Sequence, residues 1–310
     1  MLVRTINLSQ SFARPLDWGQ GPQGFWAGGG TEPEGGYRGD ITYVNISTLG
    51  NSIHAGNPLQ NVYRCAGTSG RGRGIIAGGD TNSGANNIIH YFQIASRGDS
   101  IDFGDLTANR THAQAASNGE RALIAGSYAG SLTSIDYITI SIPGNATNFG
   151  TLTTGTTHVG DSTGNGIYGM FWLDGSPDKY DYVAIDTPGN TTVFGTGPGF
   201  WEYNAANSNG SRAFWSGGYD GTAPVKIWYL TWSTPSAGTQ YGDLRLHIDN
   251  GKGVEDGSRA LVGGGNQSGN IPALEYFSMD SAAGTAVVSG SFGTLNGSNT
   301  HRQSCAAFAG

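Results

Sequence analysis

Short apolar segments separated by turn-forming residues run along the whole chain, and none of them keeps a helical period over a helical length. The clearest unit lies between residues 112 and 152. Residues 112–117 alternate small and polar side chains, and Asn118-Gly119 is a two-residue hairpin signal. The further expected segments are an apolar strand at 121–125, an alternating strand at 136–140, a turn at Pro143-Gly144-Asn145 and a strand at 146–152. This pattern predicts four short β-strands.

The same unit recurs along the chain at a nearly constant spacing. An anchor glycine that follows an aromatic or small residue stands at positions 56, 104, 150, 195, 242 and 293, at intervals of 48, 46, 45, 47 and 51. A tyrosine stands thirteen residues before each of the first five anchors, and Tyr276 stands seventeen before the sixth. The register therefore predicts six repeats, with a four-residue insertion in the last one.

Four strands per repeat at this period predict an all-β fold, a six-bladed β-propeller. The first repeat lacks its innermost strand, while residues 300–306 repeat the pattern of residues 111–117 just before the chain ends. We therefore expect the C-terminal strand to pair into the N-terminal blade and close the ring, which removes exposed sheet edges. Residues 21–310 would form this single domain, preceded by an extension at residues 1–20.

Composition narrows the possible classes of function. Glycine accounts for 53 of 310 residues, charged residues for 13%, and the formal net charge is −7 without basic runs. These values argue against a nucleic-acid partner and against a disordered chain. No apolar run is long enough for membrane insertion, and the first ten residues lack the features of a signal peptide.

The order of features resembles the kelch repeat. An apolar second strand ends in a diglycine, a third strand carries the tyrosine, and an aromatic residue marks the fourth strand. The diglycines are Gly28-Gly29, Gly78-Gly79, Gly217-Gly218 and Gly263-Gly264. The fourth repeat departs from this pattern at Ile167–Trp172, and a phenylalanine replaces the usual tryptophan in the fourth strand, so the resemblance implies a kelch-like variant.

A second resemblance is to repeats in tail- and fibre-associated structural proteins of tailed bacteriophages, of the cyanophage and marine phage type. Residues 135–140 followed by residues 143–152 carry this likeness. It implies a non-enzymatic virion protein, assembled in the host cytoplasm, that presents a propeller for host attachment or for contacts with other virion proteins of the tail, fibre, baseplate or capsid. A host-surface glycan or protein is the further partner that it implies.

A polar ring is predicted at the mouth of the central channel. Eight positions after the anchor glycines, every repeat has a hydrogen-bonding side chain, namely Arg64, His112, His158, Tyr203, Asn250 and His301. The ring could bind a ligand, or it could hold ordered water in a wet channel. A metal is not expected, because histidines around six blades stand too far apart for tetrahedral ligation.

A second set of repeated residues, four arginines, is interpreted as structural. Arg73, Arg121, Arg212 and Arg259 each stand five residues before a second-strand glycine, at a hairpin turn. We expect them to tether carbonyl or carboxylate groups of a neighbouring blade.

The sequence gives little support for an enzyme. No sialidase-type Ser-x-Asp-x-Gly-x-Thr-Trp box occurs, and the two cysteines, Cys65 and Cys305, fall on expected inner strands where a buried thiol is the simple expectation. No catalytic residue and no cofactor is therefore predicted. The alternatives to a virion protein are a free-standing carbohydrate-binding propeller and, more remotely, a propeller hydrolase or oxidase.

Two tryptophans are candidates for an interface. Trp228 occupies a register position where other repeats have Thr42, His90, Asp136, Asp181 and Glu275, so we expect it to be partly exposed. Trp201 is the second candidate, whereas Trp215 and Trp232 align with core positions. The extension at residues 1–20 is apolar enough to dock on a neighbouring protein or to pack on the propeller.

Overall fold

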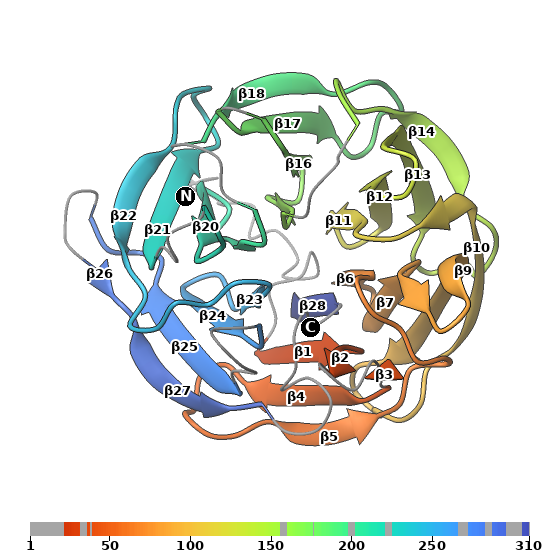
Figure 1. Cartoon of the computed structure of the whole chain (residues 1–310), viewed down its shortest axis with the longest axis horizontal. Helices are drawn as coiled ribbons and strands as arrows, with labels where there is room; N and C mark the ends of the chain where they lie inside the picture. Colours follow the sequence, from red (N-terminus) through yellow and green to blue (C-terminus); the bar gives the residue numbers. More distant parts are fainter. Residues whose placement is uncertain are drawn as a thin grey trace, which may run out of the picture.

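A computed structural model shows a disc of radially arranged β-sheets (Figure 1). It describes residues 22–31, 36–37, 39–155, 160–175, 177–197, 202–220, 225–265, 272–282, 287–295 and 306–309. Within these residues the regular elements are all strands, and no helix is long and apolar enough to cross a membrane. The extension at residues 1–20, and with it the predicted domain boundary, lies outside the described residues.

Each blade is an antiparallel sheet whose first strand lies nearest the axis (Figure 1). Blade I contains β28 (Ala306–Ala309), β1 (Gln23–Ala27), β4 (Ile41–Asn45) and β5 (Ile53–Gly56). Blade II contains β6 (Ala66–Gly70), β7 (Arg73–Ala77), β9 (Gly84–Gln93) and β10 (Ile101–Arg110), with β8 (Asp80–Thr81) paired to β9. Blade III contains β11 (Gln114–Ser117), β12 (Arg121–Ser127), β13 (Leu132–Thr139) and β14 (Thr147–Thr151).

The second half of the chain repeats this order. Blade IV contains β15 (Thr163–Gly164), β16 (Tyr168–Leu173), β17 (Lys179–Ala184) and β18 (Thr192–Thr196). Blade V contains β19 (Ala205–Ser208), β20 (Arg212–Ser216), β21 (Lys226–Thr231) and β22 (Thr239–Asp243). Blade VI contains β23 (Lys252–Glu255), β24 (Arg259–Gly263), β25 (Ala273–Ser278) and β27 (Gly290–Thr294). The short strands β2 (Gly30–Thr31) and β3 (Gly36–Tyr37) pair with each other.

The predicted closure and insertion are both confirmed. β28 pairs antiparallel with β1, from Gly24↔Ala309 to Ala27↔Ala306. This strand begins thirteen residues after its anchor Gly293 (306 − 293), whereas β11 begins ten residues after Gly104 (114 − 104). The repeat alignment placed the closing strand three residues too early because it assumed connections of equal length. The insertion precedes β26 (Val287–Val288), which pairs in parallel with β22 of blade V.

The hydrophobic core lies between blades. Each buried cluster of apolar side chains joins two adjacent blades, as where Phe25 of blade I packs with Ile76 and Phe92 of blade II. The remaining clusters do the same at the other seams of the ring. A single blade therefore has no core of its own, and its stability depends on its neighbours.

The repeated arginines link adjacent blades, as predicted. Each guanidinium donates to a carbonyl of the next blade: Arg73 to Ile140 at 2.7 Å, Arg121 to Ile185 at 3.1 Å, Arg212 to Ser281 at 2.9 Å and Arg259 to Ile46 at 2.9 Å. Each also lies over a tyrosine ring of its own blade, a favourable cation–π arrangement. Blade I has Gln23 instead, and Arg97 of blade II lies 3.9 Å from the ring centroid of Tyr43.

The Pro-Gly-Asn turn is a second link between blades. The Gly144 amide donates to the Phe103 carbonyl of the preceding blade at 2.7 Å, and Asn145 Oδ1 accepts from the Asp105 amide at 3.0 Å. A Cβ atom on the anchor Gly104 would lie 2.4 Å from the Gly144 carbonyl oxygen. The anchor position therefore requires glycine, because the turn of the next blade lies directly against it.

A buried polar side chain on the third strand is a third link. Asp136 accepts hydrogen bonds from the amide (2.9 Å) and the hydroxyl (2.7 Å) of Thr107, in the preceding blade. The equivalent contacts join Thr153 to Asp181, the Arg245 amide to Glu275, and the Leu59 amide to His90 Nδ1. Burial lowers the pKa of His90 to about 3, so its ring is neutral at physiological pH and can accept this bond. We call these contacts the side-chain clasps.

The seam between blades IV and V is built differently. Tyr168 stands at the arginine position, and Trp228 stands at the clasp position, where an indole N–H can only donate. Aromatic packing occupies this seam instead, with Tyr180 and Trp215 centroids 4.1 Å apart and Phe194 and Trp232 centroids 6.3 Å apart. This arrangement accounts for the concentration of tryptophan in the fourth and fifth repeats.

Asp136 also neutralises a buried cation. Its carboxylate lies 3.1 Å from the Arg110 guanidinium, and both side chains are fully buried. Burial lowers the pKa of Arg110, and the charge and hydrogen bond of Asp136 oppose that change. The same guanidinium donates to the Gly126 and Ser134 carbonyls. Loss of Asp136 would leave this charge without its counterion.

We therefore expect Asp136→Ala to lower the free energy of unfolding by about 3–5 kcal/mol, because it leaves Arg110 buried and unpaired. The control Asp102→Ala removes an exposed carboxylate of blade II and should change the free energy of unfolding by less than about 0.5 kcal/mol. Urea unfolding of both variants measures the difference. Equal stability of the two variants would contradict the structural role of the clasp.

Candidate binding face

The predicted ring residues share one backbone geometry. Arg64, His112, Tyr203 and Asn250 each stand two residues before an inner strand, with φ of 57°, 56°, 60° and 57°. This left-handed conformation is unfavourable for residues with a Cβ atom and is usually filled by glycine. The other two members of the predicted ring, His158 and His301, lie outside the described residues.

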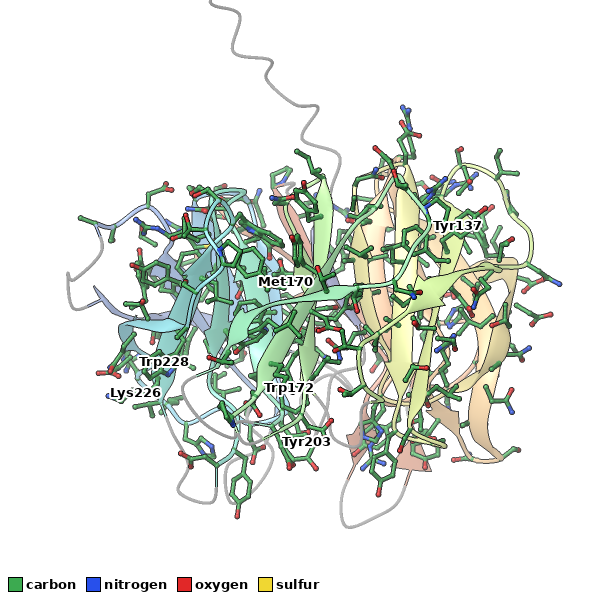
Figure 2. All side chains as sticks on the ribbon, turned by 90° about the horizontal axis from the view of Figure 1, so that it is seen from above. Tyr137, Met170, Trp172, Tyr203, Lys226 and Trp228 are labelled. Atoms are coloured by element: carbon green, nitrogen blue, oxygen red, sulfur yellow. The ribbon has the colours of Figure 1, made fainter. Side chains whose placement is uncertain are left out.

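Backbone hydrogen bonds join consecutive ring positions. The His112 amide donates to the Arg64 carbonyl at 2.8 Å, and the Asn250 amide donates to the Tyr203 carbonyl at 2.8 Å. These are the two consecutive pairs for which both members are described. We call these four described positions, linked in two pairs by backbone hydrogen bonds on one face of the disc, the belt. We call this face, carrying Arg64, His112, Tyr203 and Asn250, the linker face; Figure 2 shows Tyr203 on it, at the end of the disc opposite Tyr137.

Strain at these positions is informative about function. A residue with a Cβ atom in this region costs about 1–2 kcal/mol relative to its ordinary conformations. The sequence nevertheless places large polar or aromatic side chains at all four described positions. Glycine would serve the backbone better, so it is the side chains that account for the choice of residue. The side chains at these positions therefore serve a purpose other than backbone geometry, either contacts within the protein, as Arg64 makes with Asp80, or contacts with a ligand.

Asp80 connects two of the ring positions. Its Oδ2 atom lies 3.6 Å from Arg64 Nη1 and accepts a hydrogen bond from Thr111 Oγ1 at 2.7 Å. Arg64 also lies over the ring of Tyr63, 4.5 Å from its centroid. Thr111 Oγ1 in turn lies 3.3 Å from His112 Nδ1. The charge of Arg64 is therefore compensated within the protein, and its side chain is held in place.

Tyr203 is half-buried on the linker face. Burial, the charge of Glu202 and a hydrogen bond to Glu202 raise the pKa of the Tyr203 phenol, although Arg64 acts in the opposite direction. The phenol therefore stays protonated at neutral pH. Arg64 and Tyr128 are both within electrostatic reach of it.

Sequence reasoning missed two exposed aromatic residues. Tyr128 and Tyr219 have 53% and 45% of their surface exposed, and each directly follows the diglycine position of its repeat, Gly126-Ser127 and Gly217-Gly218. Asp80 stands at the same position of its own repeat. Tyr128 packs edge-on against His112 with centroids 5.3 Å apart, and its amide donates to the Thr111 carbonyl. The sequence could have shown these tyrosines, because they stand at the residue that follows each diglycine position. The repeat alignment did not compare that residue between repeats.

The diglycine of blade VI needs a correction. Gly264 and Gly265 have φ of 72° and 98°, which match the 65° and 98° of Gly217 and Gly218. The pair is therefore Gly264-Gly265, one residue later than the sequence pattern suggested. The error arose because three consecutive glycines stand at this point, and only the backbone conformation distinguishes them.

The tryptophan candidates have different outcomes. Trp228 is half-buried on β21, as expected for a partly exposed residue, but the reason given for it was wrong. The polar residues at the equivalent positions are buried, and four of them, His90, Asp136, Asp181 and Glu275, form the clasps. Trp215 and Trp232 are core residues as predicted, and Trp201 lies outside the described residues.

The linker face offers hydrogen bonding and aromatic contact rather than an evident catalytic pair. Thr111 and His112 approach each other, but both are buried, with 4% and 6% of their surface exposed. In the part of the chain that the structure describes, no group of three or more His, Cys, Asp or Glu side chains could hold a metal ion. Cys65 is buried beside β6, while Cys305 lies outside the described residues.

Comparisons with known proteins bear on the fold. The sequence matches no protein-family model and no curated protein sequence. Among solved structures, the chain is similar to one titled "Structure of YjhT", with a TM-score of 0.61 and 10% identity over 87% of this chain and 98% of that chain. At this identity the likeness shows the fold alone, a six-bladed β-propeller. The kelch-like and phage-like character of the repeats stays a prediction from the sequence.

The strain at the ring can be measured at Arg64. We expect Arg64→Gly to be more stable than Arg64→Val by about 1–2 kcal/mol, because glycine accepts a positive φ and valine does not. At the exposed strand residue Gln93 the order should reverse, since valine favours an extended backbone. Thermal unfolding of the four variants tests this. The same order at both positions would contradict a strained ring.

Proposed function

We propose that this chain is a non-enzymatic structural component of a tailed-phage virion, tail- or fibre-associated, whose linker face contacts a host surface or another virion protein. The repeat resemblance supports the virion role. The observation that carries a binding role is the left-handed belt at Arg64, His112, Tyr203 and Asn250, which retains side chains where glycine would relieve strain. Virion assembly and localisation follow from this proposal.

The mechanical design supports a structural role. Arginine tethers, turn contacts and side-chain clasps join neighbouring blades, so the recognisable sequence motifs are used to hold the ring together. A rigid disc presents a binding face without ordering it on contact, which lowers the entropic cost of attachment. The chain's net charge of −7 supports protein or glycan partners over nucleic acid.

The alternative is a free-standing carbohydrate-binding propeller. The exposed tyrosines of the linker face favour it, because tyrosine combines an apolar ring with a hydrogen-bonding hydroxyl. A hydrolase or oxidase is the remote alternative, for which a chromogenic substrate panel and a metal analysis of the purified chain would serve as tests.

The virion role is tested on particles. An antibody against the purified propeller should detect the chain in gradient-purified particles of the phage that encodes it, and immunogold electron microscopy should place the label on the tail or fibres. A major capsid protein serves as the positive control in the same fractions. Presence of the chain in the infected lysate but not in purified particles would overturn the virion role.

A further inference from the structure

A cleft lies on blade I, away from the linker face. Its volume is about 370 Å³, and it is lined by residues of β4, by the turn between β4 and β5, and by Arg97 from the turn of blade II. In the repeat register Tyr43 of this cleft is equivalent to Tyr137, which lies at the opposite end of the disc from Tyr203 (Figure 2). The cleft therefore shares no residue with the belt.

The equivalent groove of blade III shows what is particular to this cleft. That groove follows the same register positions from Tyr137 to Thr147, measures about 220 Å³, and has no charged residue among the described residues that line it. There Arg121 lies over the Tyr137 ring and is used as the tether to the next blade. In blade I the tether position holds Gln23, which lines the cleft, and the cation over the Tyr43 ring is Arg97 of blade II.

Arg97 is held by its ring contact and not by a counterion. Its guanidinium carbon lies 3.9 Å from the Tyr43 ring centroid. In the described part of the chain no group accepts a hydrogen bond from this guanidinium, and its Nε atom is buried without a partner. Asp99, the acid nearest to it in sequence, accepts hydrogen bonds from Asn57 instead. The cleft therefore contains a cation whose charge is not neutralised by the protein.

The backbone at Arg97 also sets this turn apart. Its φ is 58°, in the left-handed region that is unfavourable for a residue with a Cβ atom. The equivalent positions of blades III, IV and V hold proline, namely Pro143, Pro188 and Pro235. Proline fixes φ near −65°, so the turn of blade II differs in conformation as well as in residue type. That conformation accompanies the placement of a long cationic side chain over the neighbouring blade.

The amides that line the cleft add hydrogen-bond donors. Asn51 Oδ1 accepts from the Thr294 amide at 3.0 Å, and Asn45 Oδ1 accepts from the Ser47 amide at 3.0 Å. The amino groups of these two side chains and the amide of Gln23 have no partner among the described residues. No acidic side chain lines the cleft within the described part of the chain. A positive charge with several N–H donors suits an acceptor-only group such as a carboxylate, which a guanidinium can bind through two hydrogen bonds.

The remainder of the cleft suits a sugar ring. Leu49 and Ile53 are exposed where they line it and can pack against the C–H face of a ring, while side-chain amides can both donate to and accept from hydroxyl groups. The volume lies at the small end of the range for ligand sites, about 300–1,000 Å³. The chain's net charge of −7 disfavours a partner with many acidic groups, such as an acidic peptide, over a neutral scaffold with one carboxylate.

We propose that this cleft binds a hexuronic acid residue of a glycan, with the carboxylate on Arg97 and the ring hydroxyls on the amides of Gln23 and Asn51. The site lies away from the linker face, so it goes beyond the proposed function and does not rest on it.

The ligand is tested by isothermal titration calorimetry of the purified full chain. Three oligosaccharides share one neutral scaffold and end in a hexuronic acid, in its methyl ester or in the corresponding hexose. We expect the acid to bind at least about ten-fold more tightly than the ester and the hexose, because only the acid offers a charged acceptor to the guanidinium. The ester is the sharper comparison, since it keeps the ring and removes only the charge.

The site is tested by substitution of its cation. Arg97→Gln should weaken binding of the acid about ten-fold or more, while the melting temperature stays within about 4 °C of the wild type. Arg97→Lys keeps the charge but loses the planar fork, so its affinity should lie between the two. The control Arg71→Gln makes the same change in net charge at another exposed arginine with a positive φ, 51°, and should stay within about two-fold of the wild type.

Three results would overturn the proposal: no binding of the acid, equal binding of the acid and its methyl ester, or equal effects of Arg97→Gln and Arg71→Gln. Tighter binding of a blocked peptide with one glutamate than of the sugar acid would also overturn it and would replace the glycan with a protein partner. The particle experiment is independent of these outcomes. A chain found in virions that does not bind the acid would retain the proposed function and refute this site.

Discussion

The contact between one blade and the next is the constraint on which the rest of this structure depends. Every apolar cluster lies at a seam, so a blade without its neighbour would expose its core to water. Polar groups buried at those seams must also be paired, and the clasps meet this need by directing a side chain such as Asp136 at a backbone amide of the preceding blade. The repeat period follows, because each unit must present the same donors and acceptors to its neighbours.

This constraint restricts the residues on one face of the disc more than those on the other. Near the Pro-Gly-Asn turns, the anchor glycines and arginine tethers leave little freedom for change, since Gly104 lies directly against the next turn. On the linker face the backbone of the belt is fixed by bonds such as His112 N to Arg64 O, while the residue type differs from blade to blade. Side chains there can vary between blades while the ring keeps its geometry. That freedom is what a binding face needs, and residues as different as Arg64 and Tyr203 occupy equivalent positions.

Much of the architecture could be predicted from the sequence, because period, turn residues and anchor glycines are local signals. The closure by β28 and the arginine tethers were recognisable in this way. The buried clasps were not, since a carboxylate such as Asp136 resembles a solvent-facing residue until its partner from another blade is known. The linker-face positions, Arg64 and Tyr203 among them, were found from their register in the repeats. Tyr128 was missed because the repeat alignment did not compare the residues that follow the second-strand glycines.

Native-state hydrogen exchange of the clasp amides tests the account most directly. The Thr107 and Thr153 amides lie outside regular strand pairing, and each donates to a carboxylate of the next blade. If the clasps hold the ring, these amides should exchange only through global unfolding, as slowly as the core amide of Leu123. Exchange as fast as that of the exposed Gly130 amide, with Leu123 still protected, would show that the seams open locally and would contradict the account.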